Sequence, residues 1–72
     1  MSGRPKKHSL TLRGHRTSVS LEDDFWQAFC EIAAKEGRPI NDLACEVDVN
    51  RGGDVGLASA IRLFVLRRLK GS

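Results

Sequence analysis

The sequence predicts a small, mainly α-helical domain with one short β-strand, completed by pairing of two copies. Three observations predict this fold. The chain has 72 residues, and a domain of that size buries only about 60% of its unfolded surface, so it needs help to be stable. One stretch alternates like a strand, and three later stretches have helical periodicity. The two cysteines form no CxxC pair, so self-association is the remaining source of stability.

The strand is expected at about residues 15–21, "HRTSVSL". Its apolar face holds Thr17, Val19 and Leu21, and its polar face holds Arg16, Ser18 and Ser20. No other stretch is an equally good partner strand. We therefore expect an intertwined homodimer in which each chain supplies one strand of a two-stranded antiparallel ribbon across a two-fold axis.

The segment "SLTLR", residues 9–13, also alternates, but its leucines Leu10 and Leu12 are even-numbered. The phase must therefore reverse at Arg13-Gly14. A bulge at Gly14 would do this. A hairpin would do it too, placing Leu10 opposite Thr17 and Leu12 opposite His15, although Arg-Gly is a poor two-residue turn. Residues 1–8, "MSGRPKKH", are expected to be a flexible basic arm ahead of a domain at 9–72.

Three helices are expected at about 22–36, 39–49 and 57–69, the last being an extra C-terminal helix. Ser20 or Glu22 can cap the first helix, and Pro39 suits the first turn of the second. Leu69 is expected to face inward on the third. The residues expected in the core or dimer contact are Thr17, Val19, Leu21, Phe25, Trp26, Phe29, Ile32, Ile40, Leu43, Val47, Ile61 and Phe64.

Charge is unevenly distributed around the net value of +3. Residues 1–16 and 62–70 carry cations and no acid, while all nine carboxylates lie between them. This pattern indicates a polyanionic partner that contacts the two basic ends of the chain. A ribbon with arginine and serine on its outer face fits the major groove of duplex DNA, where arginine can bond bidentately to guanine.

Other classes of function are disfavoured. There is no apolar run long enough to cross a membrane, so we expect a cytoplasmic protein with reduced thiols, in which Cys30 and Cys45 are apolar fillers. The two histidines, His8 and His15, lie in or beside the arm with no nucleophile at a catalytic spacing. We expect no enzyme activity, no cofactor and no metal.

The segment "HRTSVSLEDDFWQAFCEIAAKEGRPINDLACEV" resembles the ribbon-helix-helix family of bacterial and phage repressors, which includes Arc and MetJ. It looks most like a subgroup with "GHRTSVSLE", "FW", "EIA", "EG" and a later "SAIR-FVL" segment. The resemblance covers about residues 9–66. It implies that Arg16, Ser18 and Ser20 contact bases, and that the N–H groups of Ile40 and Asn41 hold a phosphate. Pro39 replaces the usual Ser or Thr cap, and Asp42 adds a carboxylate nearby.

The expected phosphate contacts are Lys6, Lys7, Arg13, His15, Arg38, Ile40 and Asn41. The function that this combination implies is sequence-specific repression of transcription by a homodimer, in a cytoplasmic, nucleoid-associated setting. The alternative is a protein-interaction module, such as an antitoxin or adaptor, whose C-terminal helix binds a partner protein.

Overall fold

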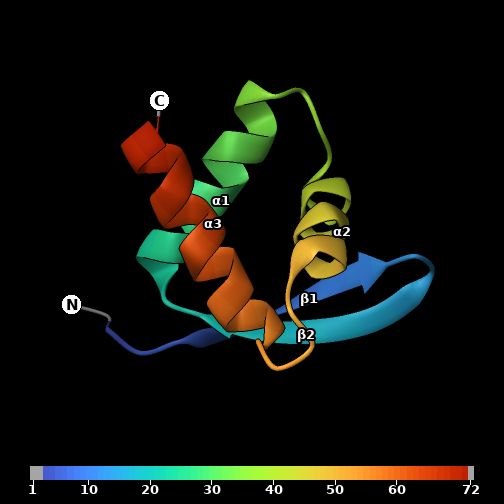
Figure 1. The fold of residues 1–72 in the computed structure, drawn as a ribbon. Helices are drawn as coiled ribbons and strands as arrows, with labels where there is room; N and C mark the ends of the chain where they lie inside the picture. The colour runs from blue at the N-terminus through green and yellow to red at the C-terminus, as the bar shows by residue number, and fades with distance from the viewer. Residues whose placement is uncertain (1–2, 72) are drawn as a thin grey trace.

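The structure, a computed structural model, describes residues 3–71. Two strands, β1 (Lys6–Leu12) and β2 (His15–Leu21), form an antiparallel hairpin. Helices α1 (Asp23–Lys35), α2 (Ile40–Asn50) and α3 (Leu57–Gly71) follow and lie together on one side of it (Figure 1). The helix ends lie within two residues of those expected from the sequence.

The expectation of a single strand per chain is wrong. Within the chain, β2 pairs with β1, and the register places Leu10 opposite Thr17 and Leu12 opposite His15. This is the hairpin that the turn chemistry disfavoured. Each chain therefore carries a complete two-stranded ribbon, and intertwining of two copies stays a prediction.

The hairpin forms because burial outweighs turn strain. Arg13 and Gly14 have φ angles of 52° and 80°, as a type I′ turn requires of both central residues. The left-handed conformation costs a non-glycine residue about 1–2 kcal/mol. Leu10 and Leu12 are only 1% and 9% exposed, and burying each leucine contributes about 1.5–3 kcal/mol. The gain from two leucines exceeds the cost at one arginine.

The basic arm is shorter than expected, because β1 begins at Lys6. His8 belongs to the strand, and its ring stacks on Trp26 with centroids 4.0 Å apart and planes 6° apart. This contact anchors the start of β1 on α1. Residues 1–2 of the expected arm lie outside the described residues.

The core lies between the inner face of the hairpin and the three helices. Every element contributes buried side chains: Leu10, Leu12, Val19, Leu21, Phe29, Ala33, Leu43, Ala44, Val47, Ala60, Ile61 and Val65. Phe25, Trp26, Ile32, Ile40 and Phe64 are half-buried against it. Leu69 corrects an expectation, since it is 66% exposed. It lies in the last turn of α3, where it lines a surface hollow together with residues of α1.

Candidate nucleic-acid interface

The outer face of the hairpin is polar and exposed along both strands. The six side chains that we name the polar face are Lys7, Ser9, Thr11, Arg16, Ser18 and Ser20. They alternate with the residues that point toward the helices, as the two-residue period of a strand requires. No carboxylate and no apolar side chain interrupts the set.

The register of the hairpin pairs the members of the polar face with one another. Ser9 lies opposite Ser18 at the centre, Thr11 lies opposite Arg16, and Lys7 lies opposite Ser20. The two cations therefore sit on different strands, toward opposite ends of the ribbon. The small central pair lets the backbone approach a ligand closely, while all six side chains can donate hydrogen bonds.

The two outer edges of the hairpin differ in how they are covered. In a two-residue hairpin Leu12 and His15 are a hydrogen-bonded pair, so the N–H and C=O groups of every polar-face residue point to the outer edges. On the β1 edge, the Thr11 N–H donates to Asn41 Oδ1 at 3.1 Å. On the β2 edge, the Ser20 carbonyl accepts from Arg62 Nη2 at 3.4 Å. The edge between Arg16 and Ser18 is the part of β2 available to another strand.

The N-terminus of α2 lies beside β1 because Asn41 binds that strand. Pro39 precedes the helix and makes no side-chain cap. The first N–H groups, those of Ile40 and Asn41, have no intrahelical acceptor, and such an end favours anions. The structure thus brings the expected phosphate-binding N–H groups next to the polar face.

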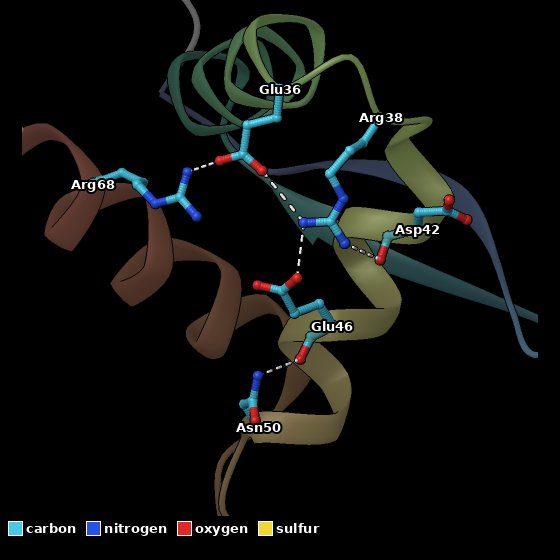
Figure 2. Close-up of polar contacts among 6 residues, drawn as sticks. All are labelled: Glu36, Arg38, Asp42, Glu46, Asn50 and Arg68. Atoms are coloured by element: carbon cyan, nitrogen blue, oxygen red, sulfur yellow. Dashed lines mark hydrogen bonds and ion pairs between the residues drawn. The ribbon is translucent and has the colours of Figure 1, made fainter.

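Two other expected phosphate contacts already have carboxylate partners. Lys6 Nζ lies 3.4 Å from Asp23 Oδ2. Arg38 Nη1 lies 2.7 Å from Glu46 Oε1 and 3.3 Å from Glu36 Oε1, in a network that also joins Arg68 to Glu36 (Figure 2).

Arg13 and His15 remain at the exposed tip of the hairpin, beside the polar face. Their role as phosphate contacts stays a prediction.

An ion pair holds the end of β2 and the start of α1 against α3. Arg62 Nε lies 2.9 Å from Glu22 Oε1, and its Nη2 lies 3.3 Å from Oε2. The hydrogen bond from Arg62 holds the pKa of the Glu22 carboxyl below its ordinary value of 4.5. Glu22 makes no side-chain cap to α1, so the expected capping role is replaced by this pair.

The sequence pattern did not place Ser9 and Thr11 on the polar face. The signal was present, since their neighbours Leu10 and Leu12 alternate with them. Placing them required β1 to be recognised as a full strand paired with β2, which the unfavourable turn argued against.

Among residues 3–71, no group of three His, Cys, Asp or Glu residues is placed to hold a metal ion. Cys30 and Cys45 are free thiols there, and burial raises the pKa of Cys30. Within the same residues, no helix has the length and apolar character needed to span a membrane.

Comparison with known proteins identifies one family. The model described as the ribbon-helix-helix domain matches residues 5–69, which is most of the chain. No curated protein matches the sequence. No solved structure matches it either.

Proposed function

Since the chain belongs to the ribbon-helix-helix domain family, we propose that it binds double-stranded DNA sequence-specifically as a homodimeric transcriptional repressor. The observation that carries this proposal is the polar face, an exposed ribbon surface of hydroxyl groups and two cations without a carboxylate. A two-stranded ribbon fits the major groove, where such donors meet base edges. A repressor of this kind would be nucleoid-associated in a bacterial cytoplasm.

The proposed dimer forms through the open edge of β2. Antiparallel pairing about a two-fold axis near Thr17 and Ser18 would satisfy the backbone groups between Arg16 and Ser18 in both copies. It would also place the β2 strands of both copies at the centre of one sheet. Arg16, Ser18 and Ser20 are then the base contacts, doubled by symmetry.

The proposed phosphate contacts surround this ribbon. Lys7 lies on the polar face, Arg13 and His15 lie at the hairpin tip, and the N–H groups of Ile40 and Asn41 open α2. If the dimer neutralises about six to ten phosphates, its affinity should fall roughly 10³–10⁵-fold between about 50 and 200 mM salt.

The test is a selection of bound duplexes from a random pool, followed by titration of the best duplex and of a random duplex. Arg16→Ala should lower affinity for the selected duplex about 5- to 150-fold per bidentate contact while changing random binding much less. Arg67→Ala removes the same charge from an exposed site on α3 and should preserve the preference. Equal losses on both duplexes for Arg16→Ala would contradict its role as a base contact.

A second candidate function is a protein-interaction module, and one observation favours it. Leu63, Leu66 and Leu69 on α3 are 43%, 49% and 66% exposed, beside the basic Arg67 and Lys70. Exposed apolar groups that gather on one element mark interaction surfaces. A folded dimer that enriches no duplex in the selection would favour this function over DNA recognition.

A further inference from the structure

The two strands of the hairpin carry similar polar side chains but occupy different positions in the proposed dimer. We propose that β1 is a phosphate-binding strand, in which Lys7, Ser9 and Thr11 contact the sugar–phosphate backbone while β2 alone reads bases. The inference rests on the proposed DNA-binding function and deepens it. It assigns a role to Ser9 and Thr11.

In the proposed dimer β1 lies at the outside of the sheet. Its outer edge is occupied at Thr11, whose N–H donates to Asn41 at 3.1 Å, and α2 packs beside the strand. The β2 edge is open from Arg16 to Ser18. A second copy can therefore add to β2 but not to the covered part of β1, which gives the order β1–β2–β2–β1 across the two-fold axis.

This four-stranded sheet is wider than the major groove. Neighbouring strands lie about 4.8 Å apart, so the axes of the two outermost strands are about 14 Å apart. The major groove is only about 12 Å wide. The central pair of β2 strands can enter the groove, whereas each β1 strand lies over a groove wall, where the phosphates are.

The β1 side chains on the polar face are all hydrogen-bond donors. Lys7, Ser9 and Thr11 are exposed on the same face as the β2 residues. A lysine ammonium and two hydroxyl groups are suitable donors to phosphate oxygens. Such contacts position a protein on the duplex without reading its sequence, because every nucleotide presents the same phosphate.

The experiment compares β1 variants on the selected duplex and on a random duplex of the same length. The double variant Ser9→Ala/Thr11→Ala should weaken binding to both duplexes by the same factor, about tenfold or more, because each copy loses two hydrogen bonds. Lys7→Gln should also weaken both equally, and it should reduce the slope of log affinity against log salt by about two per dimer.

The matched control is Lys35→Gln, which makes the same charge change at the exposed C-terminal end of α1. It should leave affinity and salt slope unchanged. The altered side chains are exposed, and circular dichroism verifies that each variant is folded.

Three outcomes would overturn the inference. A loss confined to the selected duplex, or an altered base preference, would place β1 inside the groove. Unchanged binding by both β1 variants would mean that β1 does not contact DNA. Failure of the unaltered protein to bind any duplex would remove the proposed function itself, and this inference with it.

Discussion

Glu22 and Arg62 show how one pair of side chains connects the hairpin that carries the polar face to the helices. Glu22 stands between β2 and α1, and its carboxylate binds Arg62 of α3 through both oxygens. Arg62 also donates to the Ser20 carbonyl on the β2 edge. The same guanidinium therefore fixes the start of α1 and the end of the strand that carries the proposed base contacts.

This pair predicts an acid-sensitive contribution to stability. Because Arg62 lowers the pKa of Glu22 below 4.5, the contribution is present above that value and is lost as pH falls through the lower, folded-state pKa. Glu22→Gln should therefore reduce the free energy of unfolding at neutral pH, and the difference from the unaltered protein should shrink in acid. Urea unfolding followed by Trp26 fluorescence at several pH values measures it.

The control for this prediction is Glu31→Gln, a neutralisation at an exposed position of α1. It should not reproduce the loss seen at neutral pH. A difference between Glu22→Gln and the unaltered protein that stays constant from neutral pH to acid would contradict the assignment of the effect to the Glu22 carboxylate.

At the scale of elements, alternation and helical periodicity predict which face of each strand and helix is buried. They do not predict which strand pairs with β2. The parity of the apolar residues on either side of Gly14 indicated the hairpin register that the structure shows. Turn preference alone nevertheless misplaces the partner of β2, because Arg13 is unfavourable at a type I′ turn while the burial of Leu10 and Leu12 outweighs that cost. Ser9 and Thr11 were missed for the same reason.

The turn itself gives a prediction. Arg13 has a φ angle of 52°, and asparagine tolerates this conformation better than arginine does. Arg13→Asn should therefore raise the free energy of unfolding by up to about 1 kcal/mol. Arg13→Lys keeps both the charge and the strain, so it should give no gain. Equal stability of the two variants in thermal unfolding would show that the turn stores no strain.

One ionic network joins the three helices. Glu36, at the end of α1, forms ion pairs with both Arg38 and Arg68. Arg38 also forms an ion pair with Glu46 on α2 (Figure 2). These side chains are about a third exposed, where each ion pair contributes about 0.2–1 kcal/mol. The network therefore orients the helices more than it stabilises them.

Neutralising Glu36 tests this network. Glu36→Gln weakens two pairs and should lower the free energy of unfolding by about 0.5–1.5 kcal/mol at low salt. The loss should shrink near 1 M salt, where the screening length is about 3 Å. Urea unfolding at both ionic strengths measures the effect, with Glu31→Gln as the control. A loss of stability of the same size at both salt concentrations would mean that Glu36→Gln acts through packing and not through charge.

At the scale of the whole molecule, the chain closes one core within itself, to which both strands and all three helices contribute. The sequence could not reveal this closure, because periodicity identifies the buried face of an element but not which chain covers it. Leu69 illustrates the same limit. Its position continues the inward-facing apolar stripe of α3. The last turn of the helix nevertheless extends beyond the rest of the core, so the Leu69 side chain is 66% exposed.

The dimer through β2 gives the last prediction, which a pair of cysteine variants can test. In a background with Cys30→Ala and Cys45→Ala, Ser18→Cys should be joined to its copy by a thiol cross-linker that reaches about 8 Å. Residues opposite or diagonal across two antiparallel strands have Cβ atoms about 4.5–8 Å apart.

Ser9→Cys is the matched control, since Ser9 lies opposite Ser18 within one chain. Its two copies would lie on the outermost strands, about 14 Å apart, and should not be joined. Denaturing gels report the cross-link, and sedimentation of the untreated protein reports its mass. Efficient cross-linking of Ser9→Cys, or a dimeric mass with neither variant joined, would mean that the copies meet elsewhere. In that case each hairpin would have to enter a groove alone, and β1 would lie within the groove beside β2.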